Sequence, residues 1–265
     1  MMSISRQGPR RRRPFDAKPG CIAVLAYEYP PGHRIPRHTH GSHQLVYALT
    51  GAMTVRTDGG TFVVPPSRAV WVPAEVEHAI DITGAVSMRT LYVATSLWPH
   101  APRACRVLEV SSLLRALITT AVERAGLDRR RARDARLIGV LLDELADGSP
   151  LALHVALPKD ARALRVALRV QAEPGARKPL TDWVSGTGAS PRTIERVFRA
   201  ELGVSFGRWH KQLRLIHGLS RLAAGDKVTS AALEAGYTSV SAFIQAFRQH
   251  FGVTPGSYMR APNTR

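Results

Sequence analysis

The chain has few of the features that mark secreted, disulfide-bonded or membrane-spanning proteins. Its 265 residues include only two cysteines, Cys21 and Cys105, which excludes a disulfide framework and an all-cysteine zinc site. No apolar run reaches the ~18 residues that a membrane-spanning helix needs. The arginines at 10–13 precede polar and turn residues rather than the apolar stretch of a signal peptide. We therefore expect a cytoplasmic protein without a membrane partner, associated with the nucleoid if it binds DNA.

Acidic residues are scarce, and the excess positive charge of +17 is unevenly spread. Residues 1–13 hold five arginines and no acid, whereas residues 14–158 hold 15 basic and 13 acidic residues. Residues 159–265 hold 17 basic and 7 acidic residues. This distribution predicts a polyanion-binding surface in the C-terminal part. A proteome rich in arginine produces basic protein surfaces as well, so the charge alone does not establish polyanion binding and sequence motifs must support it.

The hydrophobic pattern divides the chain into four parts and predicts a multi-domain α+β fold. Residues 1–20 are rich in Arg, Pro and Gly, which is typical of a disordered tail. Residues 21–100 contain short apolar runs between turn residues, as in a small antiparallel β-barrel. Residues 101–157 have leucines at helical spacing and predict a helical connector, which either forms a homodimer interface or packs inside the monomer. Residues 158–265 are expected to be helical throughout.

The C-terminal part contains an internal repeat at an offset of 49 residues, in which Phe198–Ser205 parallels Phe247–Thr254. Each copy is expected to hold a short helix with Thr181 or Thr229 as its N-cap, then a glycine turn and a second helix opened by serine. This is the helix-turn-helix pattern. Residues 206–224 predict one linker helix of about 28 Å. Because one DNA turn is ~34 Å, this linker is suited to placing the two second helices in successive major grooves.

Residues 160–260 resemble the DNA-binding domain of AraC/XylS-type transcription regulators. The most specific matches are Ala235-Gly236-Tyr237 and Phe251-Gly252-Val253-Thr254-Pro255. The resemblance implies sequence-specific binding to double-stranded promoter DNA, with RNA polymerase as a further partner. Gly186 departs from the family within the expected first short helix, at a cost of up to about 1 kcal/mol. The side chains that the resemblance directs toward base edges are Arg192, Glu195 and Arg196 in the first unit and Val240, Ser241, Ile244 and Gln245 in the second.

The β-rich part contains the pattern G-x5-H-x-H-x3-Q-x6-G, which holds His38, His40 and Gln44, and His78 follows later. On a strand, His38 and His40 lie on the same face because side chains alternate. The pattern resembles the two motifs of cupins, which bind a metal at the mouth of a small β-barrel. It therefore implies a pocket for one divalent ion (Zn, Fe, Ni or Cu) or for a small-molecule effector. Gln44 replaces the usual Glu and Glu75 the usual Gly, which argues against catalytic iron chemistry.

Two aromatic residues, Tyr47 and Trp71, occupy predicted strands and either line this pocket or belong to the core. Taken together, residues 20–260 resemble an AraC-type regulator whose cupin domain senses an effector. One alternative is a metal-dependent cupin enzyme with an accessory DNA-binding domain, and another is an architectural DNA-binding protein without a ligand. We expect no enzymatic activity, because Gln44 is a weak ligand and no phosphate loop, nucleophile elbow or carboxylate pair accompanies it.

Overall fold

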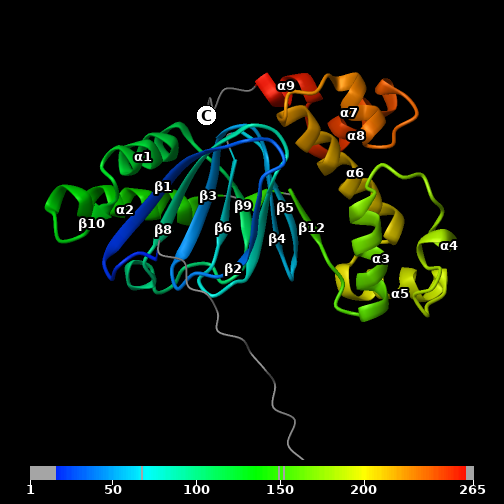
Figure 1. Ribbon diagram of the computed structural model, residues 1–265, viewed down its shortest axis with the longest axis horizontal. Helices are drawn as coiled ribbons and strands as arrows, with labels where there is room; N and C mark the ends of the chain where they lie inside the picture. Colours follow the sequence, from blue (N-terminus) through cyan, green and yellow to red (C-terminus); the bar gives the residue numbers. More distant parts are fainter. Residues whose placement is uncertain (1–15, 67, 149, 152, 261–265) are drawn as a thin grey trace, which may run out of the picture.

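The computed structural model describes residues 16–66, 68–148, 150–151 and 153–260, which form a two-sheet β domain followed by a helical domain (Figure 1). Residues 1–15 of the tail expected at residues 1–20 lie outside the described residues, whereas Asp16 and Ala17 form hydrogen bonds with Ser42. Within the described ranges, no helix is long and apolar enough to cross a membrane. The α+β class and the order of β-rich and helical parts are confirmed.

The β domain is a sandwich of two antiparallel sheets rather than a closed barrel. The strands are β1 (Cys21–Tyr29), β2 (Arg34–His38), β3 (His43–Thr50), β4 (Met53–Thr57), β5 (Gly60–Val64), β6 (Arg68–Val72), β7 (His78–Ile82), β8 (Val86–Val93), β9 (Arg106–Glu109), β10 (Leu127–Asp128), β11 (Pro150–Leu151) and β12 (His154–Ala156). One sheet has the order β10-β1-β8-β3-β6-β9-β11, and the other has the order β12-β5-β4-β7-β2. A short 3-10 helix, η1 (Thr95–Leu97), follows β8.

Strand β3 shows how alternation divides the core. Val46 and Ala48 belong to a cluster between the two sheets, whereas Leu45 and Tyr47 belong to a second cluster on the outer face of the seven-stranded sheet. Helices α1 (Ser112–Glu123) and α2 (Ala132–Asp147) cover that outer face with their buried leucines and isoleucines (Figure 1). The predicted helical stripes therefore pack inside the monomer, which removes them as the argument for a homodimer.

The segment 101–157 is not a separate connector. Its strand β9 pairs with β6, β10 with β1, β11 with β9 and β12 with β5. These pairings extend the β domain well past the boundary expected at residue 100. The short strands were missed because two to four residues are too few to show a period-two pattern.

The helical domain repeats with high regularity. Its helices are α3 (Ala161–Ala172), α4 (Leu180–Trp183), α5 (Pro191–Leu202), α6 (Phe206–Ala223), α7 (Val228–Glu234), α8 (Val240–Phe251) and α9 (Pro255–Arg260). Helix α8 begins and ends 49 residues after α5, and Gly203 and Gly252 end these helices with φ values of 70° and 79°. Such a left-handed cap suits glycine because it has no Cβ. Helix α6 is the single linker helix that the sequence predicted.

Two local expectations in the helix-turn-helix units are wrong. Pro179 and Lys227 are the N-caps of α4 and α7, so Thr181 and Thr229 lie inside these helices. Gly186 lies after α4 in a turn, with a φ of 69°. The left-handed conformation suits glycine there, so the helix-propensity cost expected for this residue does not apply.

The two domains share hydrophobic core. Val63 of β5 and Val155 of β12 are buried in the same cluster as Trp183 of α4 and the inner face of α5. Trp209 of α6 donates from its indole Nε1 to the carbonyl of Ala156 at 2.7 Å, and Gln212 donates to the carbonyl of His154 at 2.9 Å. Helix α6 therefore lies against the five-stranded sheet, on the side of the sandwich away from α1 and α2 (Figure 1).

Candidate DNA-binding face and histidine pocket

Helices α5 and α8 are built in the same way from their N-termini. The hydroxyl oxygen of Ser190 accepts from the backbone N–H of Thr193 at 3.2 Å, and Pro191 occupies the first turn. In α8, Ser239 accepts from the backbone N–H of Ala242 at 3.2 Å. Serine caps and a first-turn proline both favour a helix start. Each helix then buries one apolar face, so the opposite face is presented to solvent.

The exposed face of α5 carries Arg192 and Arg196, as the family resemblance implies. Arg199, one turn further along, lines the same hollow. Glu195 is already engaged within the protein, because its Oε2 accepts from the backbone N–H of Phe206 at 3.4 Å and lies 3.9 Å from Nε of Arg199. Of the three side chains expected to read bases in unit one, the two arginines are therefore the better placed.

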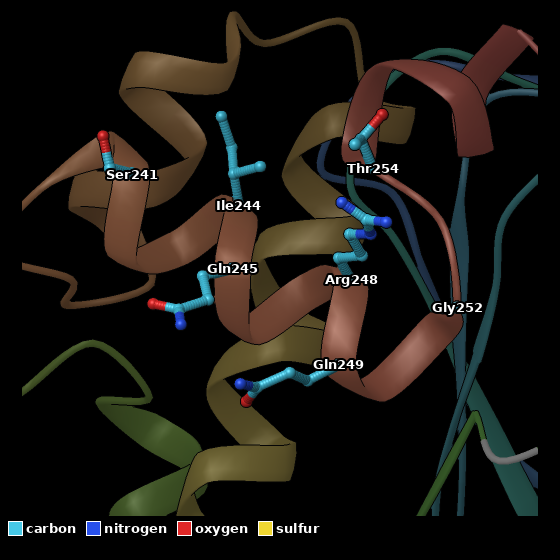
Figure 2. Close-up of a pocket in the computed structure, with 7 residues that line it drawn as sticks. All are labelled: Ser241, Ile244, Gln245, Arg248, Gln249, Gly252 and Thr254. Atoms are coloured by element: carbon cyan, nitrogen blue, oxygen red, sulfur yellow. The ribbon is translucent and has the colours of Figure 1, made fainter.

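The exposed face of α8 carries Ser241, Gln245, Arg248 and Gln249, with Ile244 half-buried beside them. In Figure 2, Gln245 and Gln249 project from the same side of the helix, one turn apart. Val240 differs from the expectation because it packs against the hydrophobic core of the domain.

Arg199 and Arg248 were not among the predicted base readers, although both lie on the presented faces. The sequence repeat could have identified both residues, because it places an arginine at the same position in the two units, 49 residues apart.

Three histidines cluster where β2 meets β7, a place that we refer to as the histidine pocket, and the register pairs His38 directly with His78. One ring nitrogen from each of His38, His40 and His78 lies within 4.8 Å of the corresponding atoms of the other two. His40 and His78 are buried, with 2% and 0% of their surface exposed. His40 follows the end of β2 by two residues, so the strand and the loop after it together supply the pair that the sequence placed on one strand. The three predicted histidines therefore converge in one site.

Backbone carbonyls orient two of these rings. Nδ1 of His38 lies 2.7 Å from the carbonyl oxygen of Pro36, and Nδ1 of His78 lies 3.0 Å from that of Val76. A carbonyl only accepts, so Nδ1 carries a proton in both rings, and in the neutral form of each ring Nε2 carries the lone pair. Metal-binding histidines in proteins are commonly held in this way.

The opposite sheet completes the pocket. Gln44 of β3 donates from Nε2 to the hydroxyl of Thr90 at 3.1 Å and to that of Tyr92 at 3.4 Å, and the Tyr92 ring centroid lies 4.9 Å from that of His40. The Oε1 atom of Gln44 is buried without a hydrogen-bond partner among the described residues. A buried acceptor of this kind is costly to leave unsatisfied, and Tyr92 links Gln44 to the neighbourhood of His40.

Two acidic residues, Asp16 and Glu75, contact His40, the first through its side chain and the second through its backbone. Oδ1 of Asp16 is 4.0 Å from Nδ1 of His40. Glu75 has a φ of 63°, and its backbone N–H donates to the carbonyl of His40 at 2.8 Å. This left-handed conformation explains why glycine is usual at the position in cupins, and it is a strained conformation for glutamate.

Tyr47 and Trp71 do not line the pocket, which corrects one of the two sequence-based alternatives. Both are 1% exposed and belong to the cluster beneath α1 and α2, on the outer face of the sheet. Trp71 also donates from Nε1 to the carbonyl of Pro102 at 3.0 Å. Residues an odd number of positions apart on a strand face opposite sides, so Tyr47 faces away from Gln44, and so does Trp71, which pairs with Leu45.

Comparison with known proteins identifies both halves of the chain. Residues 22–141 match the model of the AraC-like ligand binding domain, and residues 183–261 match that of a helix-turn-helix domain. The HTH-type transcriptional regulator NimR of Escherichia coli K12 is 36% identical over 227 residues, covering 84% of this chain and 82% of NimR. RipA of Corynebacterium diphtheriae, also an HTH-type transcriptional regulator, is 29% identical over 102 residues, covering 38% of this chain and 30% of RipA.

A solved structure of ToxT from Vibrio cholerae O395 aligns with 90% of this chain and 96% of its own, at 11% identity and a TM-score of 0.39. That score is too low for a comparison of sites. The identity to NimR extends over both the sandwich and the helical domain, and the two family matches agree with the division of the chain into a β domain and a helix-turn-helix domain. The chain belongs to the AraC family of helix-turn-helix transcription regulators, with an AraC-like ligand-binding domain at its N-terminal side.

Proposed function

We propose that this regulator binds one divalent metal ion through His38, His40 and His78, and that the occupied pocket changes its affinity for promoter DNA. The convergence of three histidines, two of them buried, is the observation that carries the proposal. Imidazole ligands suit Zn, Fe, Ni or Cu. The fixed Nδ1 protons direct Nε2 of His38 and His78 toward a ligand, and the Gln44 oxygen offers a further contact. The bound ion would supply a Lewis acid that anchors an oxygen or nitrogen atom of a small-molecule effector.

The five-stranded sheet offers a route from the pocket to the DNA-binding domain. Its order is β12-β5-β4-β7-β2, so His38 and His78 lie on β2 and β7 at one side. The other side, β5 and β12, contacts α6 and inserts into the core of unit one. A ligand that favours one arrangement of this sheet over another would thereby bias the position of the recognition helices, which is the requirement for allosteric coupling.

We also infer that the protein acts as a regulator at the nucleoid, in the cytoplasm, rather than as an enzyme. Both relatives described above are transcriptional regulators, and the neutral Gln44 replaces a carboxylate ligand. Incubation of the metal-loaded protein with a candidate effector separates these functions. Unchanged effector together with altered DNA binding supports regulation, whereas turnover that depends on His38 supports the enzyme.

Homodimerisation and contact with RNA polymerase belong to the same proposal. Because the apolar stripes of α1 and α2 are buried in the monomer, a dimer would use their outward faces, where Leu113 and Val140 are 47% and 41% exposed. Light scattering of the full chain tests the dimer, and a mass near 29.0 kDa at micromolar concentration contradicts it.

The metal is tested by elemental analysis of the full chain purified without a histidine tag. We expect one ion per chain in the wild type and almost none in a His38→Ala, His78→Ala double variant. His100→Ala is the matched control, because His100 is exposed and outside the cluster. Equal metal content in all three proteins would rule the site out. Removal of the ion with a chelator should then change the affinity of the wild type for promoter DNA and leave that of the double variant unchanged.

A further inference from the structure

The turn of the second helix-turn-helix unit is held by two arginines from outside that turn. Arg214 of α6 donates from Nε to the carbonyl of Ala235 at 2.7 Å and from Nη2 to the carbonyl of Gly236. Its guanidinium also lies 4.4 Å from the centroid of the Tyr237 ring. Arg177, in the loop between α3 and α4, donates from Nε to the same Gly236 carbonyl at 2.8 Å. Elements from both units therefore meet at one turn.

The contact of Arg214 has a counterpart in the first unit. Arg165 of α3, which precedes Arg214 by 49 residues, donates from Nη2 to the carbonyl of Thr187 at 2.8 Å. In each unit, an arginine on the preceding helix thus holds the turn that leads to the recognition helix. Arg177 breaks this symmetry, because the residue 49 positions after it is Asp226. The hydrogen bond of Arg177 joins unit one to unit two, whereas the hydrogen bond of Arg165 stays within unit one.

Two glycines allow the backbones to meet beside Arg177. A Cβ on Gly175 would lie 2.1 Å from the carbonyl oxygen of Glu234, and a Cβ on Gly236 would lie 2.2 Å from that of Gly175. Gly236 also has a φ of 74°. No other residue fits either position without moving a backbone. The loop before α4 therefore docks directly on the turn before α8.

We propose that Arg177 is a positioning residue that fixes the two recognition helices relative to each other and so sets the spacing of the two DNA half-sites that the protein accepts. Helix α6 joins the two units, and each unit also packs against the sandwich. The Arg177 bond and the contact between Gly175 and Gly236 add a direct contact between the loop of unit one and the turn of unit two. Because this contact ends at the turn before α8, it restricts the rotation of that recognition helix relative to unit one.

The test is in-vitro selection with the full chain, on duplexes whose two half-sites are separated by variable spacers. The wild type should accept one spacing and reject spacings one base pair longer or shorter. Arg177→Ala should select the same half-site sequences but lose about 10–150-fold of this discrimination, since one hydrogen bond from a charged group is removed. Arg177→Lys, which keeps the charge without the planar guanidinium, should recover only part of it. Lys178→Ala is the control in the same loop, because the ion pair of Lys178 with Glu173 stays within that loop, and it should keep the wild-type spacing preference.

Gly175→Ala supplies an independent variant, because its added methyl group forces unit two away from the loop. It should shift or broaden the accepted spacing while the half-site sequences stay the same. Thermal unfolding of each variant identifies any that fail to fold. Uniform weakening of Arg177→Ala at all spacings, with a smaller salt dependence, would assign Arg177 to a DNA phosphate and overturn the proposal. An unchanged spacing preference in both Arg177→Ala and Gly175→Ala would overturn it as well.

Discussion

Replacement of Arg196 by alanine separates sequence reading from folding. Arg196 is exposed on α5, and no hydrogen bond or ion pair ties its side chain to the rest of the described chain. Its loss should therefore change the free energy of unfolding by no more than about 0.5 kcal/mol. If the guanidinium binds a guanine edge with two hydrogen bonds, the same change costs about 1–3 kcal/mol of binding at the operator. This corresponds to a loss of affinity of roughly 5–150-fold.

Two further variants, Arg199→Ala and Gln245→Ala, are expected to affect DNA binding differently from Arg196→Ala. Arg199 lies one turn further from the N-terminus of α5, and recognition helices read bases mainly with their N-terminal residues. Arg199→Ala should therefore weaken binding to a similar degree on all sequences and reduce the salt slope. Gln245→Ala should relax specificity about one DNA turn away from the position read by Arg196, because the 18 residues of α6 span about 27 Å.

The assay is in-vitro selection from random duplexes with each purified full-length variant, followed by titration on the selected operator. Arg196→Ala should select a motif that has lost preference at one or two base pairs. Circular dichroism melting serves as the control, since all three variants should unfold at nearly the wild-type temperature. Selection of the wild-type motif by Arg196→Ala, with only uniform weakening, would refute the assignment of Arg196 as a base reader.

Three other changes test the packing. Leu219→Ala should lower the free energy of unfolding by about 2–5 kcal/mol, because Leu219 is 0% exposed in the cluster that joins the sandwich and the helices. Denaturant-induced unfolding measures this loss, and a value below about 1 kcal/mol would contradict that packing. Gly218→Ala should lower the stability of the folded protein despite the better helix propensity of alanine, because the added Cβ would lie 2.7 Å from the Phe243 ring. A raised melting temperature would contradict this expectation and show that the ring can move aside. Burial lowers the pKa of His154 from its ordinary 6.5, so the unfolded chain binds the extra proton and stability should fall as the pH drops below about 6.5. His154→Gln should flatten that decline in melts at several pH values, and an unchanged slope contradicts the assignment.

The helical domain was largely predictable because its signals are periodic and repeated. Leucine spacing, serine caps and glycine turns act locally, so α5, α6 and α8 follow from the sequence alone. The details that failed depend on tertiary position. The sequence does not reveal that Gly186 lies after a helix of only four residues, or that Glu195 turns back to the N-terminus of α6.

The pocket was predictable in its members but not in its surroundings. Spacing brought His38, His40 and His78 together, since one strand pair and its loops carry all three. The other residues near the histidines depend on which side of β3 faces the five-stranded sheet. Gln44 faces that sheet, whereas Tyr47 lies on the outer side, beneath α1 and α2. Both faces of β3 are apolar and buried, so alternation alone gave no signal. Likewise, the residues of β10 and β12 join the sheets through long-range pairing, which local patterns do not encode.

The core shared between the sandwich and the helices has a consequence for engineering and for evolution. Val63 and Val155 fill space inside the first reading unit, and Arg68 of β6 places its guanidinium 5.6 Å from the ring centroid of Tyr258 in α9. A hybrid that joins this helical domain to the β domain of another regulator would leave an apolar gap in the core, unless side chains equivalent to Val63 and Val155 were introduced into the new β domain. Recombination at residue 158 should therefore yield few viable hybrids, and the successful ones should exchange the β5 and β12 strands together with the sensor.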